Sequence, residues 1–129
     1  MVVYATIAKI IEVTINYTLC LKINYEMNRI EKLQEYLLAS PQDSFLQHAL
    51  ALELIKIDRD ADAKKLFEGI LDREPAYVGS YYHLGKLLER VNETAQAIQV
   101  YTNGMQEAKK AGDKHAYSEL QGALEELED

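Results

Sequence analysis

The chain repeats itself at a step of 34 residues, and this periodicity restricts the fold more than any other feature. The recurring pairs are Pro41 and Pro75, Leu50 and Leu84, Leu54 and Leu88, Ala63 and Ala97, Ala51 and Gly85, and Phe67 and Tyr101. A fixed period of about this length is typical of one helix–turn–helix unit stacked on copies of itself. The sequence therefore predicts an all-α fold of stacked antiparallel helix hairpins, which is an architecture suited to binding.

Composition and charge narrow the class of partner. The formal net charge of −7 argues against nucleic acid, because phosphate binding needs a concentrated basic face. Cys20 is the only cysteine, so no intramolecular disulfide forms and a reducing, cytoplasmic setting is the expectation. No cofactor is expected, since the glycines never cluster into a phosphate-binding loop.

Residues 1–26 differ from the rest of the chain and are expected to form a separate segment before a repeat domain at 27–129. This segment is rich in β-branched and aromatic residues, but Lys9, Glu12, Asn16 and Lys22 interrupt it, so a membrane-spanning helix is not expected. Two interpretations stay open. Helical spacing of the apolar residues favours an extra helix stacked on the first repeat. Alternatively, Met27 is the translational start, Asn28 caps the first helix, and the leading segment is a dispensable extension.

Periodicity and breakers place six helices after Met27. Ser40-Pro41 ends the first, because the residue before a proline avoids helical backbone angles. Asp43 or Ser44 is expected to cap the second. The expected helices cover 28–39, 44–57, 61–73, 78–91, 94–111 and 114–127, the last acting as a terminal cap.

These residues resemble the tetratricopeptide repeat family, in the form of a small two-repeat protein. One unit reads Tyr81, Leu84, Gly85, Leu88, Ala97 and Tyr101, and the preceding unit reads Gln47, Leu50, Ala51, Leu54, Ala63, Phe67 and Pro75. The resemblance implies close helix–helix approach at the small residues and aromatic side chains filling the space between units. The implied repeat-packing residues are Leu50, Ala51, Leu54, Ala63, Phe67, Pro75, Tyr81, Leu84, Gly85, Leu88, Ala97 and Tyr101.

The same resemblance implies a partner-binding groove on the concave face, lined by the first helix of each unit. Lys86 and Arg90 lie four residues apart and could receive a peptide carboxylate beside Tyr82; alternatively the face is solvated, with Glu89 or Glu93 pairing locally with Arg90. The local pairing is the expected arrangement. The implied groove residues are Phe45, His48, Leu52, Lys56, Tyr77, Tyr82, Lys86, Glu89 and Arg90.

Patterns that suggest metal binding or catalysis are incomplete. Asp58-x-Asp60-x-Asp62 opens like a calcium loop, but Ala63 stands where the loop needs glycine, so a helix-capping turn is expected instead. His48, His83 and His115 are scattered over different helices, and no pair has the spacing of a helical metal site. No metal site and no catalytic residues are expected, and the chain is expected not to be an enzyme.

The function expected from the sequence is therefore that of a non-enzymatic protein-interaction module. Its groove would capture a peptide or a partner helix of unknown identity, without nucleic acid or membrane as partner. The alternative is a self-associating assembly subunit, such as a homodimer, joined through the N-terminal segment or the open end of the first repeat.

Overall fold

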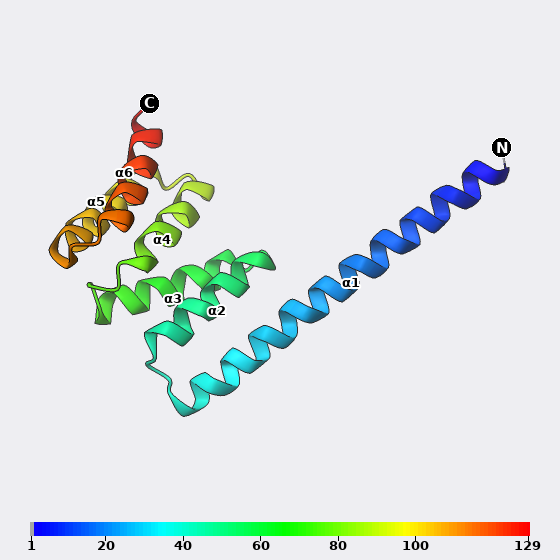
Figure 1. Ribbon diagram of the computed structural model, residues 1–129, viewed down its shortest axis with the longest axis horizontal. Helices are drawn as coiled ribbons and strands as arrows, with labels where there is room; N and C mark the ends of the chain where they lie inside the picture. Colours follow the sequence, from blue (N-terminus) through cyan, green and yellow to red (C-terminus); the bar gives the residue numbers. More distant parts are fainter. Residues whose placement is uncertain (1) are drawn as a thin grey trace.

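The computed structural model describes residues 2–129, which form six α-helices in a right-to-left stack in Figure 1. Every predicted helix after residue 40 is present, with ends within one residue of those expected. This confirms the all-α, helical-repeat prediction. The helices are α1 (Val2–Ala39), α2 (Ser44–Lys56), α3 (Asp60–Arg73), α4 (Gly79–Arg90), α5 (Thr94–Ala111) and α6 (Lys114–Glu128).

Successive helices pack against one another from α1 to α6, and α4 also contacts α6. The two repeats are the hairpins α2–α3 and α4–α5, with α6 placed where the first helix of a third unit would lie (Figure 1). The core runs through the stack as one continuous cluster of buried side chains. Nearly all the implied packing residues belong to it; Pro75 is exposed, and its carbonyl accepts a hydrogen bond from the Tyr81 hydroxyl at 2.7 Å.

Close helix approach depends on glycine at two places. A β-carbon at Gly85 would overlap the ring of Tyr101, which is fully buried between α4 and α5. A β-carbon at Gly104 would lie 2.6 Å from the β-carbon of Tyr81 and 2.9 Å from a methyl group of Leu120. The second approach, where α5 meets α4 and α6, was not predicted from the sequence.

Caps and turns set the helix ends. The Asp43 carboxylate accepts a hydrogen bond from the Leu46 N–H at 3.0 Å, so Asp43 is the cap of α2. The Asp58–Asp62 turn behaves differently from the capping turn that was expected. Arg59 occupies the cap position of α3 without a side-chain hydrogen bond, while Asp60 and Asp62 lie in the first turn of the helix. Their negative charge favours that end of the helix dipole.

The first helix differs most from expectation. Residues 28–39 do not begin a helix at Asn28; they are the end of α1, a single helix of 38 residues. Every residue from Val2 to Tyr25 is exposed, so this part of α1 does not stack on the first repeat and projects away from it (Figure 1). Of the described helices, α1 alone is long and apolar enough to cross a membrane by length and composition, and its most apolar window is wholly unburied.

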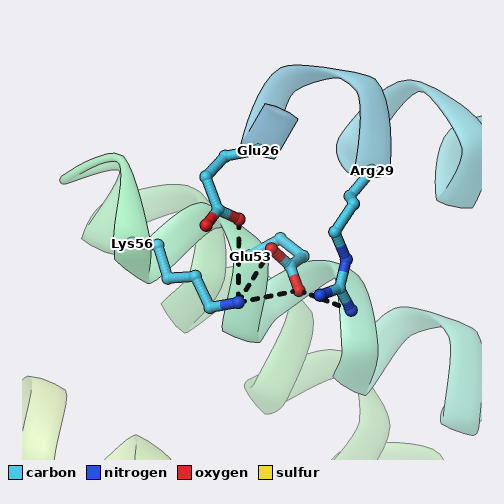
Figure 2. Close-up of polar contacts among 4 residues, drawn as sticks. All are labelled: Glu26, Arg29, Glu53 and Lys56. Carbon is cyan, nitrogen blue, oxygen red and sulfur yellow. Dashed lines mark hydrogen bonds and ion pairs between the residues drawn. The ribbon is translucent and has the colours of Figure 1, made fainter. Parts of the chain in front are cut away.

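The packed part of α1 begins at Glu26, where four charged side chains join α1 to α2 (Figure 2). Glu53 is only 3% exposed and lies 3.0 Å from Arg29 and 3.1 Å from Lys56. Lys56 also lies 3.6 Å from Glu26. Burial raises the pKa of Glu53, but the hydrogen bonds from Lys56 and the charges of Lys56 and Arg29 outweigh burial and hold that pKa below its usual value.

Candidate partner-binding groove

The helices α2, α4 and α6 share one face of the stack, and their N-terminal parts enclose two adjoining hollows of about 270 and 420 Å³. Both hollows include His48 of α2, together with Val78, Gly79 and Asp113. We call this face the groove. Its further lining residues are Tyr77, Tyr82, His83, His115 and Glu119.

His48 stands at the centre of an aromatic cluster in the groove. The rings of Phe67, Tyr77 and His83 lie 5.4–5.5 Å from its ring, centre to centre. Its Nδ1 shares a hydrogen bond of 2.9 Å with Oγ of the fully buried Ser80, which fixes the ring between the two repeats. Burial, with a smaller contribution from His83, lowers the pKa of His48 to about 4, so the imidazole is neutral at neutral pH.

The three histidines lie on different helices, α2, α4 and α6, as the sequence indicated, but all of them line the same hollow. Burial lowers the pKa of His83, and the nearby Glu119 carboxylate only partly opposes this effect. Within residues 2–129, no three histidine, cysteine or acidic side chains are grouped to hold a metal ion. The lowered pKa values of His48 and His83 favour their neutral imidazoles. Ser80, His83 and Glu119 were missed, since only the folded stack brings α2, α4 and α6 together.

The predicted cationic residues of α4 are already engaged by carboxylates. Lys86 lies 3.2 Å from Glu89 and 3.5 Å from Glu126 of α6, with its ammonium over the ring of Tyr82. Glu89 also accepts a hydrogen bond from the hydroxyl of buried Tyr101. Burial is the largest influence on the pKa of Lys86 and lowers it, but Glu89 and Glu126 reverse the effect and leave it raised.

Arg90 takes a different partner from the one expected, since its guanidinium lies 3.0 Å from Asp60 of α3. Glu93 instead pairs with Lys64, at 3.4 Å. Lys86 and Arg90 are thus both paired with carboxylates of the protein itself. A partner carboxylate would have to displace Glu89, Glu126 or Asp60 to reach them.

The remaining predicted groove residues fall into two groups. Phe45 is 70% exposed, and Leu52 and Tyr77 are half-buried against the core. Lys56 is instead directed toward α1, in the charged cluster with Glu26 and Glu53 (Figure 2). Lys56 lines neither hollow.

Comparison with known proteins identifies the fold and the family. No protein-family model matches the sequence, and no curated protein matches it. Among solved structures, a tetratricopeptide repeat domain protein from Salinibacter ruber is 44% identical, with a TM-score of 0.65; the match covers 67% of this chain and 96% of that one. A protein from Bordetella parapertussis is 26% identical, with a TM-score of 0.67, over 76% of this chain and 85% of that one.

A more distant match shares the fold alone. The TPR2B domain of yeast Sti1, solved as a complex with pHsp70, is 15% identical over 84% of this chain and 86% of that one, with a TM-score of 0.75. The Salinibacter match, at 44% identity over nearly the whole of that chain, carries the assignment. The repeat period, the buried small and aromatic residues and this match together show that the chain belongs to the tetratricopeptide repeat family.

Proposed function

We propose that this protein is a non-enzymatic interaction module that binds a peptide or a partner helix in the groove formed by α2, α4 and α6. The observation that supports this most is the pair of hollows around the neutral His48, lined by tyrosines and histidines with the carboxylates of Asp113 and Glu119. Tyrosine gives a large contact area with a polar tip, which suits protein recognition. The Sti1 domain, whose structure was solved as a complex with pHsp70, offers an analogy for such use of the fold.

The chemistry of the groove favours shape and aromatic contact over capture of a carboxylate. Lys86 and Arg90 are held by Glu89, Glu126 and Asp60, and releasing them would cost the partner part of its binding free energy. Phe45 is exposed, and Leu52 and Tyr82 are half-buried against the core, so apolar and aromatic surface remains accessible. We therefore propose a partner that inserts apolar or aromatic side chains, in a reducing cytoplasmic setting consistent with the single free thiol of Cys20.

The experiment is selection of peptides from a random library on the full chain, followed by titration of the selected peptide. Tyr82→Ala should weaken binding by about tenfold or more if the ring is a central contact. Tyr36→Ala is the matched control, because Tyr36 is exposed on α1, which contributes nothing to the hollows. Equal affinity of both variants and the unaltered protein would contradict the groove as the binding site.

A charge-reversal pair tests the recognition chemistry. Lys86→Glu with Arg90→Glu should leave the affinity for the selected peptide within about threefold, provided that circular dichroism shows the fold intact. Loss of binding together with strong salt dependence would instead support a carboxylate clamp.

A further inference from the structure

The exposed part of α1 carries more apolar surface than an isolated helix in water normally shows. Every residue from Val2 to Tyr25 is exposed, and nothing else in the described chain covers them. Extended exposed apolar surfaces mark sites of association. The large apolar side chains involved are Val2, Val3, Tyr4, Ile7, Ile10, Ile11, Val13, Ile15, Tyr17, Leu19, Leu21, Ile23 and Tyr25.

The exposed apolar side chains occur on all sides of α1. One row of them has the spacing of a coiled-coil seam, and Val2, Ile15, Leu19 and Ile23 lie away from that row. Positions spaced alternately by four and three residues form one row along α1, which we call the seam. Such spacing keeps a row on one side of two helices that wind around each other. The seam residues are Val3, Ile7, Ile10, Thr14, Tyr17 and Leu21.

The charged side chains of this segment and Asn16 avoid the seam. The positions flanking it are Tyr4, Thr6, Ile11, Val13, Thr18 and Cys20, so the flanks also lack charge. Lys9, Glu12, Asn16 and Lys22 all fall on the outer positions. The hydroxyls of Thr6, Thr14 and Thr18 donate to carbonyls four residues earlier, at 2.8–3.0 Å, and need no further partner.

The repeat domain lies on the opposite side of α1 from the seam. Glu26 and Ile30 are buried, and Leu33 and Leu37 pack on the core. At 3.6 residues per turn, these four side chains point roughly 150° away from the mean direction of the seam. A helix placed along the seam would therefore meet no part of the domain to which α1 belongs.

We propose that the seam binds the α1 helix of a second copy of this chain in antiparallel orientation. In this register Val3 faces Leu21 of the second copy, Ile7 faces Tyr17, and Ile10 faces Thr14. A second copy covers the seam and leaves Lys9, Glu12 and Asn16 in water, together with the apolar Ile15, Leu19 and Ile23 of the outer face. A lipid bilayer would have to cover those polar side chains as well, at a considerable cost.

Charge favours the antiparallel orientation. Continuing the seam toward the domain in the same alternation gives Asn24, Asn28, Glu31 and Glu35. A parallel pair would bring Glu31 and Glu35 of the two copies together, and would place two chains of net charge −7 with their domains side by side. The antiparallel pair separates the domains at opposite ends of the joined helices.

This arrangement has a consequence for binding, which rests on the function proposed for the groove. At about 1.5 Å per residue, the two points where α1 enters a domain would lie about 40 Å apart. Two grooves held at that spacing could bind two sites on one partner, which raises the effective affinity without new contacts. The self-association itself does not depend on the groove.

The first test measures molar mass by light scattering over a range of concentrations, using the full chain and two matched variants. Ile10→Glu places a charge on the seam, and Ile15→Glu places the same charge on an outer position; the two isoleucines are 60% and 53% exposed. We expect dimers for the unaltered chain and Ile15→Glu, and a dissociation constant raised at least about tenfold by Ile10→Glu. A monomer at all concentrations, or equal effects of both variants, would overturn the proposal.

Flotation with vesicles of phosphatidylcholine and phosphatidylglycerol tests whether a lipid bilayer, rather than a second copy, covers the seam. We expect no flotation of the full chain at concentrations where it is dimeric. Flotation that both glutamate variants reduce equally would overturn the proposal in favour of a bilayer.

The second test determines orientation in a Cys20→Ser background. Val3→Cys and Leu21→Cys proteins are oxidised separately and as a mixture. The antiparallel pair predicts a disulfide-linked dimer in the mixture that is absent from either protein alone. Cross-linking within each separate protein would indicate a parallel pair, and no cross-link in any sample would contradict the pairing of these positions.

Discussion

Among single residues, Gly85 has the least room for a side chain, because the ring of Tyr101 lies directly against it. Gly85→Ala would push a methyl group into the buried Tyr101 ring, so we expect destabilisation by about 1–3 kcal/mol despite alanine's higher helix propensity. Gly122→Ala is the control, because nothing lies within 4 Å of its added methyl group and the same propensity should stabilise α6 by up to about 1 kcal/mol. Urea unfolding measures both, and equal effects would contradict the packing argument.

The pH dependence of stability should report on His48. Its pKa of about 4 in the folded protein is below the ordinary value of 6.5, so the unfolded chain binds a proton that the folded chain excludes. The contribution of neutral His48 to the free energy of unfolding is complete above about pH 6.5 and is lost as the pH falls toward 4. After allowance for partial exposure of the ring, the loss should be about 1–2 kcal/mol.

His48→Gln removes this titration while leaving a side chain able to hydrogen-bond with Ser80. We expect the variant to be less stable than the unaltered protein near pH 7, with a difference that shrinks near pH 4.5. Denaturant unfolding at the two pH values measures this, and His83 titrates in both proteins. A difference independent of pH would show that His48 does not titrate as its burial requires.

The sequence predicted residues whose role follows from the repeat and missed those that depend on contacts between units. Gly85 could be recognised because it occupies the small-residue position of a known motif. Gly104 could not, since its neighbours Tyr81 and Leu120 come from helices that meet only in the stack. The meeting of His48, His83 and His115 escaped prediction for the same reason.

At the scale of elements, α1 is divided by burial into a packed end and an exposed extension. Ile30 is 2% exposed and Ile23 is 54% exposed, although they lie only two turns apart. Ile30→Ala should destabilise the domain by about 2–4 kcal/mol, because it leaves a cavity between α1 and α2. Ile23→Ala should change the stability of the dilute protein by less than about 0.5 kcal/mol. Thermal unfolding compares them, and a comparable loss for both would mean that α1 is packed further toward its N-terminus.

Helix ends were predictable where a residue enforces them. Ser40-Pro41 and Asp43 define the break between α1 and α2 through backbone restriction and capping, and both act locally. The start of α1 was missed because Asn28 and Glu31 suggested a capping box, while no glycine or proline interrupts the chain between Val2 and Ala39. The chain continues as a helix through Asn28 because no breaker accompanies the cap signal.

At the scale of the whole molecule, the extension and the domain should be separable in stability. Residues 2–25 bury nothing within one copy, so a chain beginning at Met27 should fold and, when dilute, melt within a few degrees of the full chain. It loses Glu26, but Glu53 keeps both Arg29 and Lys56 as partners. If α1 pairs between copies, the melting temperature of the full chain should rise with concentration while that of the shorter chain stays constant, because dimerisation stabilises by mass action. A large loss of stability in the dilute shorter chain would contradict the division at Glu26. If the melting temperatures of the two chains instead stay equal at every concentration, the domain folds without the extension and pairing through α1 is excluded.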